Sequence, residues 1–122
     1  MADIENSLKR AMAISGSIAA CLVDYDSGMA LGTAGGGGLD LEVAAAGNTD
    51  VVKAKLRTME SLGLNEQIED LLITLDTQFH LLRPVHSKWG RGLFLYLALN
   101  RSQANLAMAR RELAIIEAEL EL

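Results

Sequence analysis

Two uninterrupted apolar segments constrain the fold of this chain more than any other feature. Residues 93–99 read LFLYLAL, and residues 17–25 read SIAACLVDY between Gly16 and an Asp26-Ser27-Gly28 turn. Both segments are too short to be buried helices, and strands that are apolar at consecutive positions are typical of sheets covered on both faces. The sequence therefore predicts two central strands with helices packed above and below them.

The other elements are predicted from the spacing of apolar residues and from turn signals. Two amphipathic helices are expected, one of about three turns that ends at Gly16 and a long one from about Asp40 to Leu62. Three more strands are expected at 29–33, 68–75 and 79–83, the last ending at Pro84. A final helix capped by Asn100 or Ser102 is expected to bury Leu106, Ala109, Leu113, Ile116 and Leu120.

The order of the strands follows from pairing each central strand with its hairpin neighbour. This gives one five-stranded sheet in the order 2-1-5-4-3, with helices on both faces, in a single domain over residues 1–122. The strand at 68–75 then forms an open edge that carries Leu71, Leu72 and Ile73. Since an uncovered apolar edge promotes aggregation, we expect a symmetric partner strand to cover it.

The long middle helix has two apolar stripes. A broad arc that includes Leu41, Val52 and Met59 is suited to packing on a sheet. A second stripe of small residues at Val43, Gly47 and Ala54 would let another helix approach closely. Small residues also recur by chance in an alanine-rich helix, so periodicity alone leaves both interpretations open.

Composition and charge exclude several classes of protein. The chain is 50% hydrophobic and carries a formal net charge of −5, which argues against disorder and against binding to nucleic acid or anionic membranes. A single cysteine permits no internal disulfide, and neither a signal peptide nor a membrane-spanning run is recognisable. We therefore expect a cytoplasmic protein. Its apolar residues are more numerous than one compact core requires, so we expect some of them to contact a partner.

The sequence offers little for catalysis, cofactor binding or metal binding. The glycine run at 35–38 lacks the lysine and hydroxyl residue of a phosphate-binding loop, and no hydrolase or dinucleotide motif is present. His80 and His86 have no cysteine beside them, and Cys21 lies within an apolar strand. We predict no catalytic, cofactor or metal site.

Charge is segregated along the second half of the chain. All charges between Glu60 and Asp76 are negative, whereas all charges between Arg83 and Arg111 are positive. These residues would serve as ordinary solvated surface charges. Alternatively, Lys88, Trp89 and Arg91 form a partner-binding loop, because Trp and Arg are enriched at binding hot spots.

The order of elements and three stretches of sequence resemble the roadblock/dynein light-chain family, a relative of the longin and profilin-like folds. The stretches are ACLVDYDSGMALGT, FHLLRPV and GLFLYLALNRSQANLAMARREL, together with the Ala-rich middle helix. The resemblance implies an α+β fold with an antiparallel sheet, the middle helix on one face and the two terminal helices on the other. The tetraglycine and the short C-terminal tail depart from many relatives.

The resemblance also implies a function. It implies a non-catalytic homodimer in which the third strands pair into a ten-stranded sheet and the middle helices pack together. In this sequence the interface falls on Val43, Gly47, Val51, Ala54, Leu71, Ile73 and Leu75. Bacterial relatives bind Ras-like small GTPases, so we expect a GTPase regulator or scaffold. The alternatives are a light-chain-type adaptor without a GTPase and a profilin- or PAS-like small-molecule sensor, which needs a polar-lined cavity.

Overall fold

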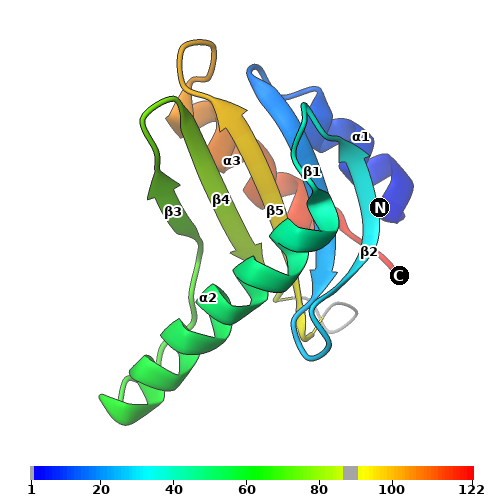
Figure 1. Ribbon diagram of the computed structural model, residues 1–122. Helices are drawn as coiled ribbons and strands as arrows, with labels where there is room; N and C mark the ends of the chain where they lie inside the picture. The colour runs from blue at the N-terminus through cyan, green and yellow to red at the C-terminus, as the bar shows by residue number, and fades with distance from the viewer. Residues whose placement is uncertain (1, 87–90) are drawn as a thin grey trace.

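A computed structural model describes residues 2–86 and 91–122 as one sheet with helices on both faces (Figure 1). The elements follow the predicted order of helix, two strands, helix, three strands and helix. Their bounds are α1 Ile4–Met12, β1 Ser17–Asp24, β2 Met29–Gly35, α2 Leu41–Ser61, β3 Leu71–Thr74, β4 Gln78–Pro84, β5 Leu93–Asn100 and α3 Leu106–Glu119.

The sheet is antiparallel throughout and has the order β2-β1-β5-β4-β3, which confirms the predicted topology. The two apolar segments are its central strands, β1 and β5, and Leu93 to Leu99 are all buried. One row of residues crosses four strands, with Cys21 opposite Tyr96, Tyr96 opposite Leu82, and Leu82 opposite Leu71. Continuous apolar sequence therefore marks strands that are buried on both faces.

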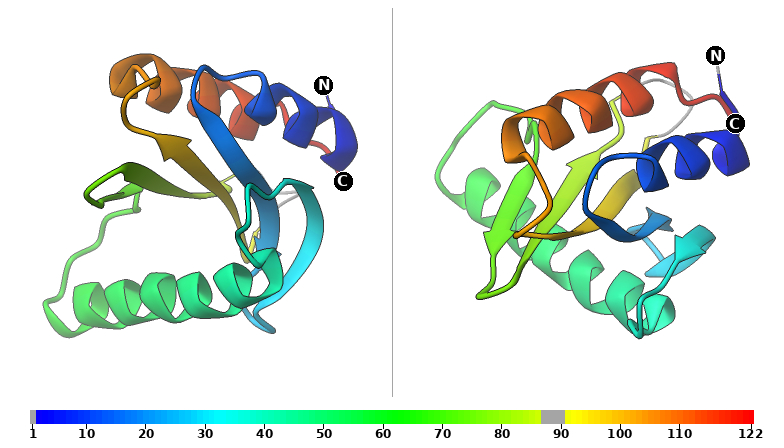
Figure 2. Two further views of the ribbon diagram at one scale, coloured as in Figure 1. Left: turned by 45° about the horizontal axis from the view of Figure 1, so that its top comes forward. Right: turned by 90° about the horizontal axis from the view of Figure 1, so that it is seen from above.

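Each face of the sheet has its own core. On one face, Leu22, Leu95 and Leu97 pack with buried residues of α1 and α3. On the other, Cys21, Phe94 and Tyr96 pack against α2. Figure 2 shows α1 and α3 side by side on one side of the sheet and α2 alone on the other. The predicted placement of the helices is thus confirmed, and the two cores of this five-stranded sheet contain many of the apolar residues of the chain.

The final helix begins later than predicted. Its N-cap is Asn105, whose side chain accepts a hydrogen bond from the Met108 amide at 3.1 Å. Asn100 instead ends β5, and its side chain accepts bonds from the amide and the hydroxyl of Ser102. The sequence prediction of Asn100 or Ser102 as the cap was wrong because these two residues bond to each other in a local turn.

The edge strand is shorter than predicted, since β3 begins at Leu71 rather than Ile68 and ends at Thr74. The preceding residues are held by contacts outside the sheet. The Ile68 carbonyl accepts a hydrogen bond from His86 Nε2 at 2.8 Å, and the Asp70 carboxylate is bound by Arg110 of α3. These tethers hold residues 68–70 outside the β4 ladder, although their alternating pattern is typical of a strand.

Candidate functional site

The two edges of the sheet differ in how they are protected. At the β2 edge the pairing with β1 is interrupted by a bulge at Leu22/Val23, and α1 lies against Gly32 so closely that a Cβ there would be 2.7 Å from Ile4 Cγ2. Bulges and covering helices are common ways to prevent edge pairing. β3, in contrast, pairs regularly with β4 and reads LLIT, without charge or proline. β3 is therefore the less protected edge.

The β3 side chains divide between the two faces of the sheet. Leu71 and Ile73 are half-buried and pack with Leu56 against the core under α2. Leu72 points to the other face and keeps 38% of its surface exposed, while Leu75 lies just past the strand, where its amide donates to the Gln78 carbonyl. The predicted residues Leu71, Ile73 and Leu75 thus lie together along this edge.

The second predicted stripe of α2 is exposed. Val43 has 67% of its surface exposed, and Val51 and Ala54 are also exposed. A Cβ built at Gly47 would have no atom within 4 Å. The opposite face, which includes Leu41, Ala45 and Val52, is buried on the sheet. The helix therefore has one face packed on the sheet and one small-residue face, which we call the α2 stripe (Val43, Gly47, Val51, Ala54), with no partner among the described residues.

Two apolar residues that the sequence analysis did not assign to an interface extend this surface. Leu62 and Leu64 flank Gly63 after α2 and are 66% and 45% exposed. Figure 1 shows that the C-terminal end of α2 projects beyond β3 before the chain turns back to the sheet. The sequence did contain a signal for these residues: a glycine flanked by two leucines marks the end of a helix, and apolar residues at this position commonly pack on the helix terminus.

A groove of about 400 Å³ separates the C-terminal half of α2 from the β3 edge. Lys55 and Met59 line its helix side. Its other side is formed by the returning chain and by β3, with Leu64, Glu66, Gln67, Ile68, Glu69, Asp70, Leu71, Leu72 and Ile73. We call this the α2–β3 groove. Lys55, on its helix side, is one helical turn from Val51 of the α2 stripe, so the groove lies between the α2 stripe and the open edge.

A hydrogen-bonded chain of polar side chains lies between α2 and the sheet. His80 Nε2 is 2.7 Å from Gln78 Oε1, and the Tyr96 hydroxyl is 3.2 Å from His80 Nδ1. Because the Gln78 oxygen can only accept, Nε2 carries the hydrogen and the Tyr96 hydroxyl donates to Nδ1. Burial lowers the pKa of His80, and burial, followed by repulsion from the thiolate form of Cys21, raises the pKa of Tyr96 to about 12. These three hydrogen-bonded side chains are therefore uncharged near neutral pH, which suits them to a structural role.

The lowered pKa of His80 predicts a pH dependence of stability. Below the ordinary histidine pKa of 6.5 the unfolded chain binds a proton that the folded chain resists, so the free energy of unfolding should fall as the pH falls from 6.5 towards the folded pKa. His80→Gln should reduce this dependence. Urea denaturation of both proteins at pH 7.5 and at about pH 5.5 checks it; equal losses in both would show that His80 is not the group responsible.

The remaining candidate residues do not assemble into a chemical site in the part of the chain that the structure describes. Cys21 is buried, and burial raises its pKa to about 12, which disfavours the nucleophilic thiolate. His80 bonds Gln78 and His86 bonds Ile68, so they do not converge. No group of three or more His, Cys, Asp or Glu residues close enough to hold a metal occurs in residues 2–86 and 91–122.

Among the ion pairs of residues 2–86 and 91–122, the pair between Arg110 and Asp70 joins the acidic segment to the basic one. The Arg110 guanidinium donates two hydrogen bonds, of 2.9 and 3.0 Å, to the Asp70 carboxylate, joining the acidic segment to α3. This pairing raises the pKa of Arg110. Within the predicted partner-binding loop, Lys88 and Trp89 lie outside the described residues, and Arg91 is exposed.

Among the described helices, none is both long and apolar enough to cross a membrane.

Comparison with solved structures identifies the fold. A Roadblock/LC7 domain from Streptomyces avermitilis superposes with a TM-score of 0.80 at 15% sequence identity, covering 96% of this chain and 93% of that one. The chain has a Roadblock/LC7 fold. Myxococcus xanthus MglB has the same fold, with a TM-score of 0.82, 18% identity, and coverage of 95% and 89%. The resemblance noted in the sequence is therefore confirmed at the level of the fold.

A further MglB structure, described as having a tetrameric arrangement, matches the Roadblock/LC7 fold of this chain with a TM-score of 0.67 and 15% identity, covering 95% of this chain and 88% of that one. No protein-family model and no curated protein sequence matches the chain. At these identities the shared property is the fold, and the surface residues of this chain must be interpreted from their own geometry.

Proposed function

We propose that this protein is a non-catalytic homodimer that regulates or scaffolds a Ras-like small GTPase. The observation that carries the proposal is the continuity of three features that a monomer leaves uncovered: the β3 edge, the α2–β3 groove and the α2 stripe. Contiguous exposed apolar surface of this kind marks protein interaction sites. A symmetric partner covers all three at once.

In the proposed dimer, a two-fold axis runs beside β3. The two β3 strands pair antiparallel and extend the sheets into one of ten strands, while α2 of each copy packs beside α2 of the other. Gly47 and Ala54 have side chains small enough to let the helix backbones approach, and Val43 and Val51 supply apolar contact. Leu71, Ile73 and Leu75 lie along the pairing edge, where Leu71 and Ile73 also support α2.

The GTPase is proposed from the Roadblock/LC7 fold and from the likeness to MglB. The second candidate is an adaptor that dimerises other chains without a GTPase. A tetrameric arrangement is described for one MglB, and assembly with further copies is the property that such an adaptor needs. The two candidates share the dimer and differ in the partner.

The test measures nucleotide hydrolysis. A Ras-like small GTPase from the same organism, loaded with GTP, is mixed with the purified protein, and phosphate release and complex formation are followed. We expect a stable complex and a changed hydrolysis rate. A complex without a change in rate would favour the adaptor, and neither complex nor change with any Ras-like GTPase of the organism would contradict the proposal.

A further inference from the structure

The α2–β3 groove contains charged side chains that make no ion pair within 4.0 Å among the described residues, although the charge of Glu69 helps to raise the pKa of Arg110. Lys55 is the basic residue of its lining, and Glu66, Glu69 and Asp70 are the acidic ones. Both oxygens of Asp70 are bound by Arg110. In residues 2–86 and 91–122, the ion pairs within 4.0 Å join Arg10 to Glu119, Arg83 to Glu117 and Arg110 to Asp70, so Lys55, Glu66 and Glu69 have none.

Lys55 lies between two exposed apolar residues, Val51 and Leu62, on one side of α2. At 3.6 residues per turn, Val51, Lys55, Thr58 and Leu62 follow one another at steps of four, three and four and share one side of the helix. Lys55 lines the groove, so this side faces the β3 edge. Val51 and Leu62 are exposed at the two ends of this row. A second copy that approaches the β3 edge must therefore cover a lysine as well as apolar side chains.

Covering a lysine with apolar surface is costly unless an acidic group compensates its charge. Two copies of a chain with a net charge of −5 also repel each other, so their contact needs local attraction. A two-fold axis supplies it, because every contact occurs twice: the groove of one copy offers Glu66 and Glu69, and the other copy offers Lys55. A single charged position within an apolar helix contact also fixes register, since a shift would leave the charge buried alone.

We infer that Lys55 of each copy pairs with Glu66 or Glu69 of the other copy, and that these two symmetric contacts set the register of the homodimer. The inference rests on the proposed homodimer and adds to it the residues that select a second copy of this chain as the occupant of the groove. The three side chains are exposed in the single chain, so their replacement leaves its core intact.

Charge reversal tests the inference. One variant is Lys55→Glu and the other is the double change Glu66→Lys with Glu69→Lys. Each variant alone brings like charges together at two symmetric places, so its homodimer dissociation constant should rise roughly tenfold, the sum of several exposed-pair contributions. Mixed together, the variants restore opposite charges at both places. Native mass spectrometry of the mixture should therefore show mostly heterodimer.

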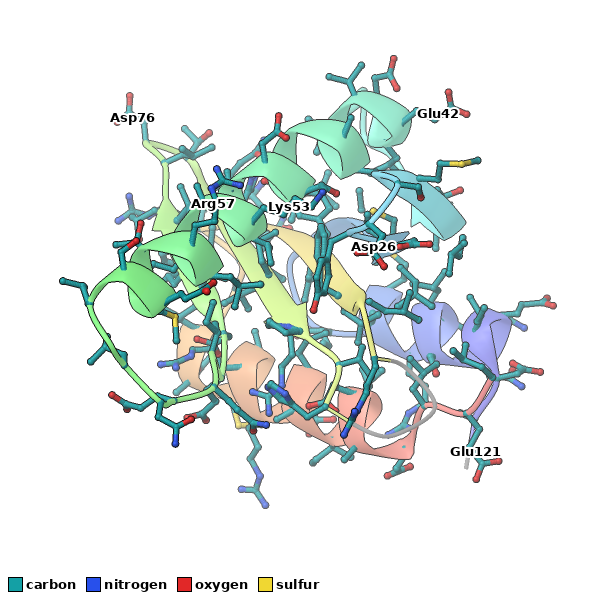
Figure 3. The ribbon with its side chains drawn as sticks, turned by 90° about the horizontal axis from the view of Figure 1, so that it is seen from below. Asp26, Glu42, Lys53, Arg57, Asp76 and Glu121 are labelled. Carbon is teal, nitrogen blue, oxygen red and sulfur yellow. The ribbon has the colours of Figure 1, made fainter. Side chains whose placement is uncertain are left out.

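A matched control distinguishes this pairing from a general effect of charge. Lys53 is two residues from Lys55, about 200° around the helix, and Figure 3 shows its side chain with that of Arg57 on the side of α2 seen from below. Lys53→Glu should leave the dissociation constant nearly unchanged. A random mixture of homodimers and heterodimers would overturn the inference while leaving the homodimer in place, whereas a monomeric wild-type chain would overturn the proposed function itself.

Discussion

Replacing Gly47 by leucine is expected to convert the dimer to monomer. The residue lies on the exposed face of α2, and a Cβ there would meet no atom within 4 Å in the single chain. In the proposed dimer the same side chain is inserted twice between two closely packed helices. Overpacking of about 1–3 kcal/mol at each of two symmetric sites raises the dissociation constant by at least about thirtyfold. Sedimentation velocity over a range of concentrations measures the change.

The folded chain itself should tolerate this substitution, and leucine favours a helix over glycine by about 0.8–1 kcal/mol. The Gly47→Leu monomer should therefore remain folded, and the substitution itself should not lower its thermal stability. Ala46→Leu is the control, because Ala46 lies on the same turn but towards the β1–β2 turn, near Gly28. If Gly47→Leu dimerised as tightly as Ala46→Leu, the α2 stripe would not be the interface.

Glu117→Ala should cause the largest loss of stability among single charge removals, about 3–5 kcal/mol in the free energy of unfolding. Glu117 of α3 is only 5% exposed. Its carboxylate accepts a bond from Arg83 Nε of β4 at 3.2 Å and lies 3.4 Å from the His86 amide. Removing it leaves the guanidinium of Arg83 largely buried without a counter-charge. Urea denaturation monitored by circular dichroism measures the loss.

The Arg10–Glu119 pair, two residues further along α3, provides the control for this prediction. Its distance is shorter, 2.9 Å, but both side chains are well exposed, at 37% and 42%. Solvent screens such pairs, so Glu119→Ala should cost less than about 1 kcal/mol. Equal losses for Glu117→Ala and Glu119→Ala would mean that burial does not determine the energetics of these ion pairs.

The order of the strands could be predicted because it depends on local patterns. LFLYLAL and SIAACLV are apolar at consecutive positions, and only central strands require this. The cap of α3 was missed because Asn100 and Ser102 bond to each other locally. The start of β3 could not be predicted, since it depends on contacts between distant residues. The tethers from Arg110 and His86 hold residues 68–70 out of the ladder, and no local pattern encodes them.

The candidate surface was only partly predictable for a related reason. Helical spacing predicted that the small residues of α2 share one face, and in the structure this face is exposed to solvent. The leucines of β3 occupy both faces of the strand, so the sequence does not distinguish Ile73, which packs under α2, from Leu72, which is exposed. Ile73→Lys would therefore disturb the single chain as well as a dimer. Gly47→Leu separates the two effects because a Cβ at Gly47 would meet no atom within 4 Å in the single chain.

In the proposed dimer, a second copy covers the surface that one chain leaves exposed. The molar mass in solution, measured by sedimentation equilibrium or light scattering at micromolar concentrations, tests this proposal. We expect a mass twice the 13.1 kDa of one chain, falling towards one chain in Gly47→Leu. A wild-type mass of 13.1 kDa at every concentration would contradict it.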